Sequence, residues 1–405
     1  MTLLHPLRLS NFTVTSCLGR GLQQTLTALR AGKSGLAQCT FDTVDLPTFT
    51  GEVTGVDEVQ LPAQLSRFDC RNNRLALLGL SQDGFSDAVI AAAQKYGSQR
   101  VGVFIGTSTS GILQTELAYR GLDPVSGALP DDFEYASTHN TFSVADFTRQ
   151  YLGLTGPAVV VSSACSSSAK VFASASRMMA AGLIDAAVVG GVDSLCLTTL
   201  YGFNSLGLIS TRACRPFDAS RDGISIGEAA AFALLESVTS RPDANAVLLL
   251  GVGESSDAHH MSSPHPEGLG ARMAMQDALQ MAGLDAADID YINLHGTATQ
   301  SNDTAEAMAV SGLFGPHTPC SSTKGATGHT LGAAGGVEAV ICALALQHSL
   351  MPGGLNTKEL DPALEVNYLR ENRSLPLRHV LSNSFGFGGT NCSLIFGLGS
   401  EVEAT

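Results

Sequence analysis

The sequence predicts an α/β protein built from two similar halves. In both halves, short apolar segments typical of buried strands alternate with helical stretches rich in small residues. The order strand, helix, strand implies parallel strands that are covered by helices. A chain of 405 residues, of which 44% are hydrophobic and only 15% charged, can bury a large core of this kind.

The first half contains one complete strand–helix–strand unit. A strand is predicted from Val101, in VGVFIG, and it runs into a turn of Gly, Ser and Thr. PAVVVS, residues 157–162, predicts a second strand, and a helix follows from Cys165 to about Ala181. DAAVVGG, residues 185–191, then predicts the third strand.

The second half repeats this order. Strands are predicted at 246–251 and 291–294, with a helix over 269–283 that ends at a Gly C-cap. Asp303 is expected to start a further helix, with Glu306 completing its N-terminal cap. A small-residue helix over 330–347 and two strands around a glycine turn complete the chain. We place the boundary between the halves at 243/244, which gives segments 1–243 and 244–405.

Composition excludes several classes of protein. A net charge of −14 argues against a nucleic-acid partner. The nine cysteines are odd in number and form no CxxC pair, so neither a disulfide framework nor a zinc site is expected. The N-terminus shows no signal-peptide pattern and we find no 18-residue apolar run, which predicts a cytoplasmic chain without a membrane partner.

Cys165 is the first candidate functional residue. It lies between a predicted strand and a predicted helix, where free N–H groups and the helix dipole favour the thiolate. We therefore predict that its pKa falls below the free value of about 8.5. Taken alone, such a cysteine is more often a buried, inert residue.

Two histidines change that balance. His295 directly follows the predicted strand YINL, and His329 precedes a helix, each in a turn of Gly and Thr. Glycine permits close approach of the backbone at such turns. A zinc site is the competing interpretation, but a third ligand at suitable spacing is lacking. We therefore expect no metal.

The motifs around these residues occur together and in a characteristic order. They are SSACSSSA, RPFDASRDGISIGEAAA, HGTATQSNDTAEA, STKGATGHTLGAAGGVEAV and NSFGFGGTN. From about residue 100 to the end, the chain resembles the β-ketoacyl-acyl-carrier-protein synthases, above all the elongating enzymes of type II fatty acid and polyketide systems. The resemblance implies the thiolase fold, a five-layered αβαβα sandwich of duplicated halves, usually dimeric.

The resemblance also implies the reaction. Cys165 would hold an acyl chain, and a malonyl-carrier thioester would lose CO₂ and extend that chain by two carbons. His295 and His329 would act on the malonyl unit if both present N–H groups to the enolate oxygen. Phosphopantetheine would arrive on an acyl carrier protein, so the chain itself needs no cofactor.

Further roles follow from the resemblance. Lys324 would fix the site electrostatically, and Glu338, an isolated charge in an apolar helix, could pair with it. The backbone N–H groups of Cys165 and Phe387 would form an oxyanion hole. Other predicted positions are the acyl-pocket residue Ile112, the pantetheine-binding residues Thr297 and Thr299, the helix-capping Asp303, and Phe385 beside Phe387, which would act as a gate.

One loop departs from the family pattern. Gln300-Ser301-Asn302-Asp303 stands where the family usually has a Pro and a Gly before the Asp. This difference, together with an atypical N-terminus, suggests a specialised lineage, and clusters of the bacterial aryl-polyene type are one candidate.

Carrier docking is a separate question, because an acidic carrier would be repelled by a chain of charge −14. Arg67, Arg71 and Arg74 have a spacing that places them on one face of a helix. We predict either a local docking patch or a face occupied by solvated or ion-paired side chains.

Three functions remain at this stage. The elongating synthase comes first, as a homodimer or as the active half of a heterodimer with a chain-length factor. A degradative thiolase is second, although Cys392 follows GGTN and does not match that class's second cysteine. A non-catalytic chain-length factor is third, and it would lack Cys165.

Overall fold

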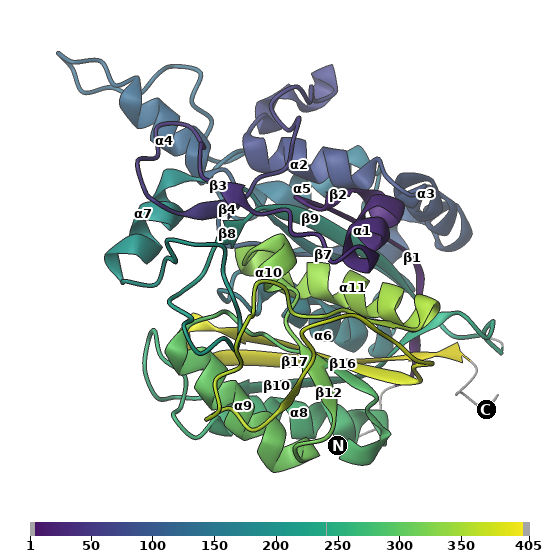
Figure 1. Cartoon of the computed structure of the whole chain (residues 1–405). Helices are drawn as coiled ribbons and strands as arrows, with labels where there is room; N and C mark the ends of the chain where they lie inside the picture. Colours follow the sequence, from purple (N-terminus) through teal and green to yellow (C-terminus); the bar gives the residue numbers. More distant parts are fainter. Residues whose placement is uncertain (1–4, 240, 400–405) are drawn as a thin grey trace.

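The computed structural model describes residues 5–239 and 241–399 and confirms the α/β fold (Figure 1). Strands of the N-terminal half lie in the order β6, β5, β7, β9, β1. The first three are parallel, whereas β9 and β1 each run antiparallel to the preceding strand. Their bounds are Leu7–Ser16 (β1), Val101–Gly106 (β5), Ala158–Val161 (β6), Ala186–Asp193 (β7) and Ala229–Ser237 (β9).

The C-terminal half has the same topology. Its strands lie in the order β12, β11, β16, β17, β10, again with three parallel strands followed by two antiparallel ones. Numbered in chain order, the strands of each half are arranged 3-2-4-5-1, which confirms the duplication. The bounds are Val247–Ser256 (β10), Tyr291–Asn293 (β11), Pro319–Ser321 (β12), His379–Gly386 (β16) and Thr390–Leu398 (β17).

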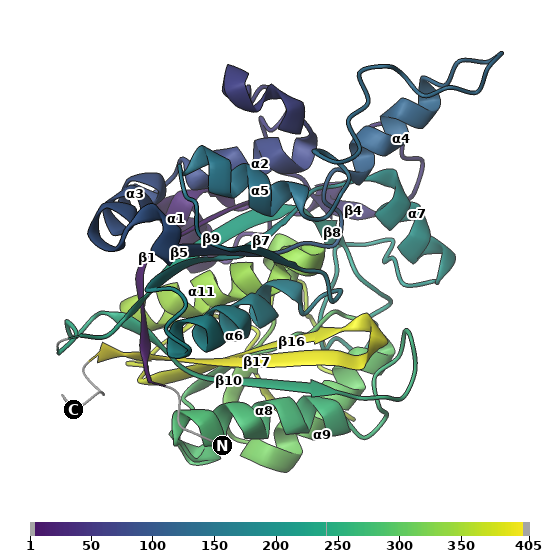
Figure 2. The ribbon, with the colours of Figure 1, turned by 180° about the vertical axis from the view of Figure 1, so that it is seen from behind.

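Two helices separate the sheets and two groups of helices cover them, which gives the five expected layers (Figure 2). α6 (Ser167–Ala180) and α11 (Ala334–His348) form the central layer. They approach closely because Gly335 has no side chain: a Cβ there would lie 2.6 Å from the backbone nitrogen of Ala169. The outer helices are α2 (Arg71–Leu80), α3 (Phe85–Tyr96), α5 (Ser143–Tyr151), α8 (Leu269–Ala282) and α9 (Gln300–Phe314).

The central helix α11 shows that the expected absence of an 18-residue apolar run was wrong. Leu331–His348 forms an 18-residue helical stretch with a mean hydropathy of 1.4, which is apolar enough to cross a membrane by length and composition. However, 89% of this stretch is buried inside the structure. Its apolar residues pack against both sheets, as expected for a helix that is hydrophobic on all sides.

The smaller elements lie around the site and at the periphery. The helix expected from Asp303 begins three residues earlier, at Gln300, because the Thr299 hydroxyl accepts a hydrogen bond from the Asn302 N–H and caps it. The other helices are α1 (Gly21–Arg30), α4 (Ile112–Arg120), α7 (Leu197–Ser205) and α10 (Lys324–Thr327). The short strands are β2 (Gly19–Arg20), β3 (Ala37–Gln38), β4 (Phe49–Gly51), β8 (Ile226–Gly227), β13 (Leu350–Met351), β14 (Asn367–Tyr368) and β15 (Arg373–Ser374).

Candidate active site

Cys165 lies in the tight turn between β6 and α6. The preceding residue, Ala164, has a φ of +52°, a conformation that residues with a side chain rarely adopt. This turn places Cys165 at the carboxyl end of the parallel strands, where α/β proteins usually carry their sites. The Cys165 side chain is buried, with the residue only 6% exposed.

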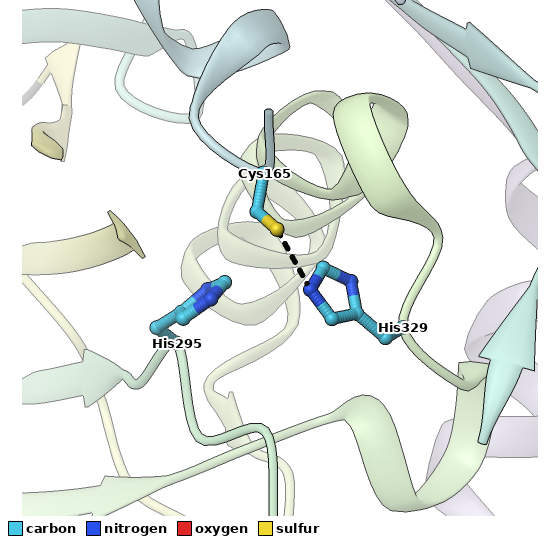
Figure 3. A group of neighbouring side chains, drawn as sticks. All are labelled: Cys165, His295 and His329. Carbon is cyan, nitrogen blue, oxygen red and sulfur yellow. Dashed lines mark hydrogen bonds between the residues drawn. The ribbon is translucent and has the colours of Figure 1, made fainter. Parts of the chain in front are cut away.

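The two predicted histidines converge on this thiol (Figure 3). Nε2 of His329 lies 3.1 Å from Sγ of Cys165. The His295 ring stands at 85° to the His329 ring, with 5.4 Å between their centroids. The nucleophile therefore comes from the N-terminal half and both histidines come from the C-terminal half.

Hydrogen bonds fix which nitrogen of each histidine carries the proton. The backbone N–H of Leu331 donates to Nδ1 of His329 at 3.2 Å, and Nζ of Lys324 lies 3.3 Å from Nδ1 of His295. A backbone N–H and an ammonium group can only donate. Both Nδ1 atoms are therefore acceptors, and each neutral ring has its proton on Nε2.

Lys324 and Glu338 form the buried ion pair expected from the sequence. Nζ of Lys324 donates to Oε1 of Glu338 at 2.5 Å and to the carbonyl oxygen of His295 at 2.6 Å. Burial raises the pKa of Glu338 to about 7, and the Lys324 ammonium acts in the opposite direction. One lysine thus holds both the ring and the backbone of His295.

The pKa shifts match neutral histidines but not a resting thiolate. Burial, with the nearby Lys324 charge, lowers the pKa of both His295 and His329 well below 6.5. Burial also raises the pKa of Cys165 to about 11, although Lys324 and the Phe387 backbone N–H lower it. The prediction of a depressed Cys165 pKa is wrong, because loss of solvent outweighs the favourable charges around the sulfur.

The glycine turn between β16 and β17 carries the two predicted aromatic residues. Phe387 directs its backbone N–H at Cys165, as an oxyanion-hole donor would. The ring centroids of Phe385 and His295 lie 5.9 Å apart, and those of Phe387 and Phe203 lie 5.6 Å apart. Gly388 has a φ of +80°, so this turn requires a residue without a side chain.

Two carboxylates hold the loop that carries His295. Asp303 Oδ1 accepts from the backbone N–H groups of Thr297 and Ala298. Glu306 accepts from the N–H groups of His295 and Gly296, each at 2.8 Å. The sequence suggested only a helix cap for Glu306, because its spacing from Asp303 is that of a capping pair. The structure instead makes it a support for the catalytic loop.

A cavity opens onto the three central side chains. Among the described residues it is lined by Cys165, Phe203, Leu208, Ile224, Asp257, Ser262, Ser263, Pro264, His295, Thr297, Thr299, Ser301, Asn302, His329, Phe385, Gly386, Phe387, Gly389 and Asn391. The predicted pantetheine residues Thr297 and Thr299 belong to this lining, together with the atypical Ser301 and Asn302. Ile112 is the first residue of α4 and lies outside this set, so its role in the acyl pocket stays a prediction.

The three arginines do not form one solvent-facing row. Arg71 is only 6% exposed and binds Glu228 at 2.6 Å and Asp57 at 2.7 Å. Arg67 lies in a separate 3₁₀ turn, Ala63–Phe68, and Arg74 pairs with Asp69. The idea that Arg71 docks a carrier is therefore wrong, since its charge is neutralised inside the protein.

A metal ion could in principle use the same three side chains. The ligand atoms of Cys165, His295 and His329 all lie within 4.8 Å of one another. However, a divalent ion bound to His295 would lie close to the buried ammonium of Lys324, which contacts the same ring. The repulsion between these charges in a poorly solvated site favours the cysteine nucleophile over a metal centre.

Duplicated halves of the thiolase type, with a buried cysteine facing two histidines, are the features of an acyltransferase that forms carbon–carbon bonds. The chain belongs to the β-ketoacyl synthase family. The N-terminal domain of that family matches residues 12–240, and its C-terminal domain matches residues 246–358.

Individual relatives support this assignment over nearly the whole chain. The 3-oxoacyl-[acyl-carrier-protein] synthase 2 of Vibrio cholerae is 32% identical, covering 94% of this chain and 96% of the relative. A ketosynthase (ApeO) solved with its chain length factor (ApeC) from Xenorhabdus doucetiae is 38% identical, with a TM-score of 0.88 and 98% of each chain covered. The ishigamide ketosynthase/chain length factor is 26% identical with a TM-score of 0.87, covering 98% of this chain and 99% of that one.

Proposed function

We propose that the protein is an elongating β-ketoacyl-acyl-carrier-protein synthase that holds the growing chain on Cys165. The observation that carries this proposal is the convergence of both histidines on the Cys165 sulfur: Nε2 of His329 lies 3.1 Å away, and a ring nitrogen of His295 lies within 4.8 Å. Such an arrangement suits a site that must stabilise negative charge on oxygen beside an acylated cysteine.

In the first step, Cys165 attacks the carbonyl carbon of an acyl-carrier thioester. The new carbon–sulfur bond forms as the bond to the carrier sulfur breaks, and the proton of Cys165 ends on the departing carrier thiol. Backbone N–H groups of Phe387 and Cys165 would hold the oxygen of the tetrahedral intermediate, and the Phe387 N–H already hydrogen-bonds Cys165. The resting thiol has a raised pKa, so it must lose its proton as it attacks.

In the second step, a malonyl-carrier thioester enters. Its bond to the carboxylate breaks, CO₂ leaves, and the electron pair forms an enolate. The enolate oxygen accepts hydrogen bonds from Nε2 of His295 and His329, while its carbon attacks the acyl group on Cys165. The Cys165 sulfur is expelled and takes up a proton from solvent, and the product is a β-ketoacyl thioester two carbons longer.

The neutral state of the histidines suits this second step. A neutral Nε2–H donor stabilises the enolate without protonating it, and a low pKa keeps that state at neutral pH. The degradative alternative needs a second catalytic cysteine, but Cys392 is fully buried in β17 within the hydrophobic core. The phosphopantetheine arm comes with the carrier, so this scheme uses no further cofactor.

The similarity to ketosynthases solved with chain length factors favours a heterodimer as the working state. We place the chain in a polyene-type pathway, since it shares 38% identity with ApeO and differs from the usual family pattern at Gln300–Asp303. A reducing cytoplasm fits the nine cysteines, which are all free.

Intact mass spectrometry tests the central claim. The protein is mixed with carrier proteins loaded with acyl groups of different length and unsaturation, and Cys165 should gain one acyl group. The Cys165→Ala variant should gain none, and its acylation would refute the assignment. Mass photometry of the chain alone and with a co-expressed chain-length factor then distinguishes homodimer from heterodimer.

A further inference from the structure

The helices α4 and α7 pack against each other at one end of the molecule (Figures 1 and 2). α7 carries Phe203, which lines the cavity at Cys165. The Phe203 ring packs against Phe387 at 5.6 Å with an interplanar angle of 48°. The position of α7 therefore determines part of the packing around the residue that the family uses as a gate.

Leu197, Leu200 and Phe203 of α7 pack in one hydrophobic cluster, but the N-terminus of α7 has no cap within its own sequence. Leu200 is its only buried residue, and no acidic residue stands in its first turn. Its N-cap residue, Cys196, makes no side-chain capping bond. The first N–H groups of a helix have no partner within the helix, so α7 depends on contacts from elsewhere.

Glu116 of α4 supplies the missing cap. Its Oε2 accepts from the Leu197 N–H at 3.0 Å, and its Oε1 accepts from the Thr198 N–H at 2.7 Å. The Thr198 hydroxyl donates to the same Oε1 at 2.5 Å. The carboxylate thus satisfies two free N–H groups and places a negative charge at the positive end of the helix dipole.

α4 is anchored independently of this contact. Arg120 binds Asp42 at 2.7 Å, and the Thr115 hydroxyl lies 2.5 Å from Nδ1 of His139. Glu116 lies four residues after Ile112, so both side chains project from the same face of α4. A displacement of α4 at Ile112 would therefore also displace α7, because the Glu116 carboxylate is hydrogen-bonded to the N-terminus of α7.

We propose that Glu116 is a positioning residue for the condensation step. Glu116 fixes α7 to α4, and this keeps the Phe203 ring packed against Phe387. A shift of Ile112 in the acyl pocket would therefore move Phe387, the proposed gate residue. Glu116 acts through Phe203 and does not touch the substrate. The inference rests on the proposed function, because a gate matters only if acyl and malonyl groups use the site in turn.

Single-turnover mass spectrometry of the full chain, with its chain-length factor if one is needed, separates the two steps. Glu116→Ala should slow condensation about fivefold and slow acylation of Cys165 to a smaller extent, because loss of the helix cap weakens the placement of Phe203 against Phe387. Glu116→Gln should fall between this variant and the wild type. Tyr119→Phe is the matched control, because Tyr119 is an exposed residue of the same helix and the change leaves the Arg120–Asp42 anchor in place. Equal slowing of both steps, or equal behaviour of Glu116→Ala and Tyr119→Phe, would overturn the proposal.

A double-mutant cycle tests the route through Phe203. If Glu116 acts by placing Phe203, then Glu116→Ala should have little further effect on condensation in a Phe203→Ala background. Independent, multiplying effects would show that Glu116 acts by another route and would refute the coupling.

A substrate-free measurement keeps this inference separate from the proposed function. The chain has no Trp, so Phe203→Trp introduces a single fluorescent reporter on α7. Its emission should shift to the red when Glu116→Ala is added and stay constant when Tyr119→Phe is added. An unchanged emission in the Glu116→Ala background would overturn the positioning role. If Glu116→Ala causes the red shift but the wild-type protein catalyses no condensation, the positioning role stands and the proposed function is refuted.

Discussion

Nζ of Lys324 contacts His295 at two points, 2.6 Å from its carbonyl oxygen and 3.3 Å from Nδ1. The lysine therefore sets the protonated nitrogen of His295 from a position that does not line the cavity. Through this contact Lys324 keeps the Nε2–H of His295 available to stabilise negative charge, which its ion pair with Glu338 alone would not do.

Lys324→Met should remove this control. His295 could then place its proton on either nitrogen, and Glu338 would lose its partner. We expect malonyl decarboxylation to fall about 10²–10³-fold, as when one oxyanion donor is removed. Release of CO₂ from a malonyl-carrier thioester measures this directly. Lys95→Ala, on the exposed surface, is the control. Decarboxylation at the wild-type rate in Lys324→Met would contradict the assignment.

The reactivity of Cys165 should rise with pH across the whole neutral and mildly alkaline range. Because its folded pKa is raised to about 11, the thiol form dominates at pH 7 and the thiolate fraction increases about tenfold per pH unit below that value. Peptide mapping after brief iodoacetamide treatment at several pH values measures the rate. A plateau that begins near pH 7 would show that the pKa is depressed after all.

His295 and His329 should both stay neutral between about pH 6 and 8. The pKa of each histidine is lowered, so both rings are neutral above their folded pKa and would lose the required state only on further acidification. The measurement is an NMR titration of the two histidine rings, which follows their protonation separately from that of Glu338. A ring signal of His295 or His329 that titrates with a midpoint near 6.5 would show an unperturbed histidine.

Arg71→Ala should destabilise the protein strongly. Glu228, which is fully buried, would be left without its cation, and breaking such a pair costs about 3–5 kcal/mol. Arg67→Ala should change the free energy of unfolding by less than about 0.5 kcal/mol, since it is an exposed side chain. Urea unfolding compares the two. Similar stabilities would mean that the Arg71 network is not formed.

Of the three arginines, Arg67 and Arg74 remain candidates for carrier docking. Arg67→Glu should raise KM for carrier-bound substrates and leave KM for small acyl thioesters unchanged, because steering acts on the charged carrier. Steady-state kinetics with both substrate types gives the answer. Equal changes in the two KM values would exclude Arg67 from docking.

The duplication and the grouping of motifs could be predicted from the sequence because they depend on local patterns. Buried parallel strands appear as short apolar runs, and turns at their carboxyl ends carry the reactive residues. Cys165, His295 and His329 could thus be expected to meet. The lone charge of Glu338 in an apolar helix was also sufficient to predict its pairing with Lys324.

Other features depend on burial and on contacts between distant segments. The helical spacing of Arg71 gave no sign of Glu228, 157 residues away, and that partner turns an apparent surface charge into a buried one. The dipole argument for Cys165 failed for a similar reason, since the desolvation of a sulfur depends on everything packed around it. Glu116 carries no motif at all, because its role appears only when α4 and α7 are adjacent.

The repeated topology has a consequence for the origin of the chemistry. In each half, the turn after the third strand in chain order faces the middle of the molecule: after β6 it carries Cys165, and after β12 it carries Lys324 and His329. Corresponding positions in the two copies thus perform different tasks, one covalent and one electrostatic. Joining both copies in one polypeptide allowed each to specialise, which a symmetric pair of identical half-chains could not do. Neither half, expressed by itself, would hold a complete set of reactive groups.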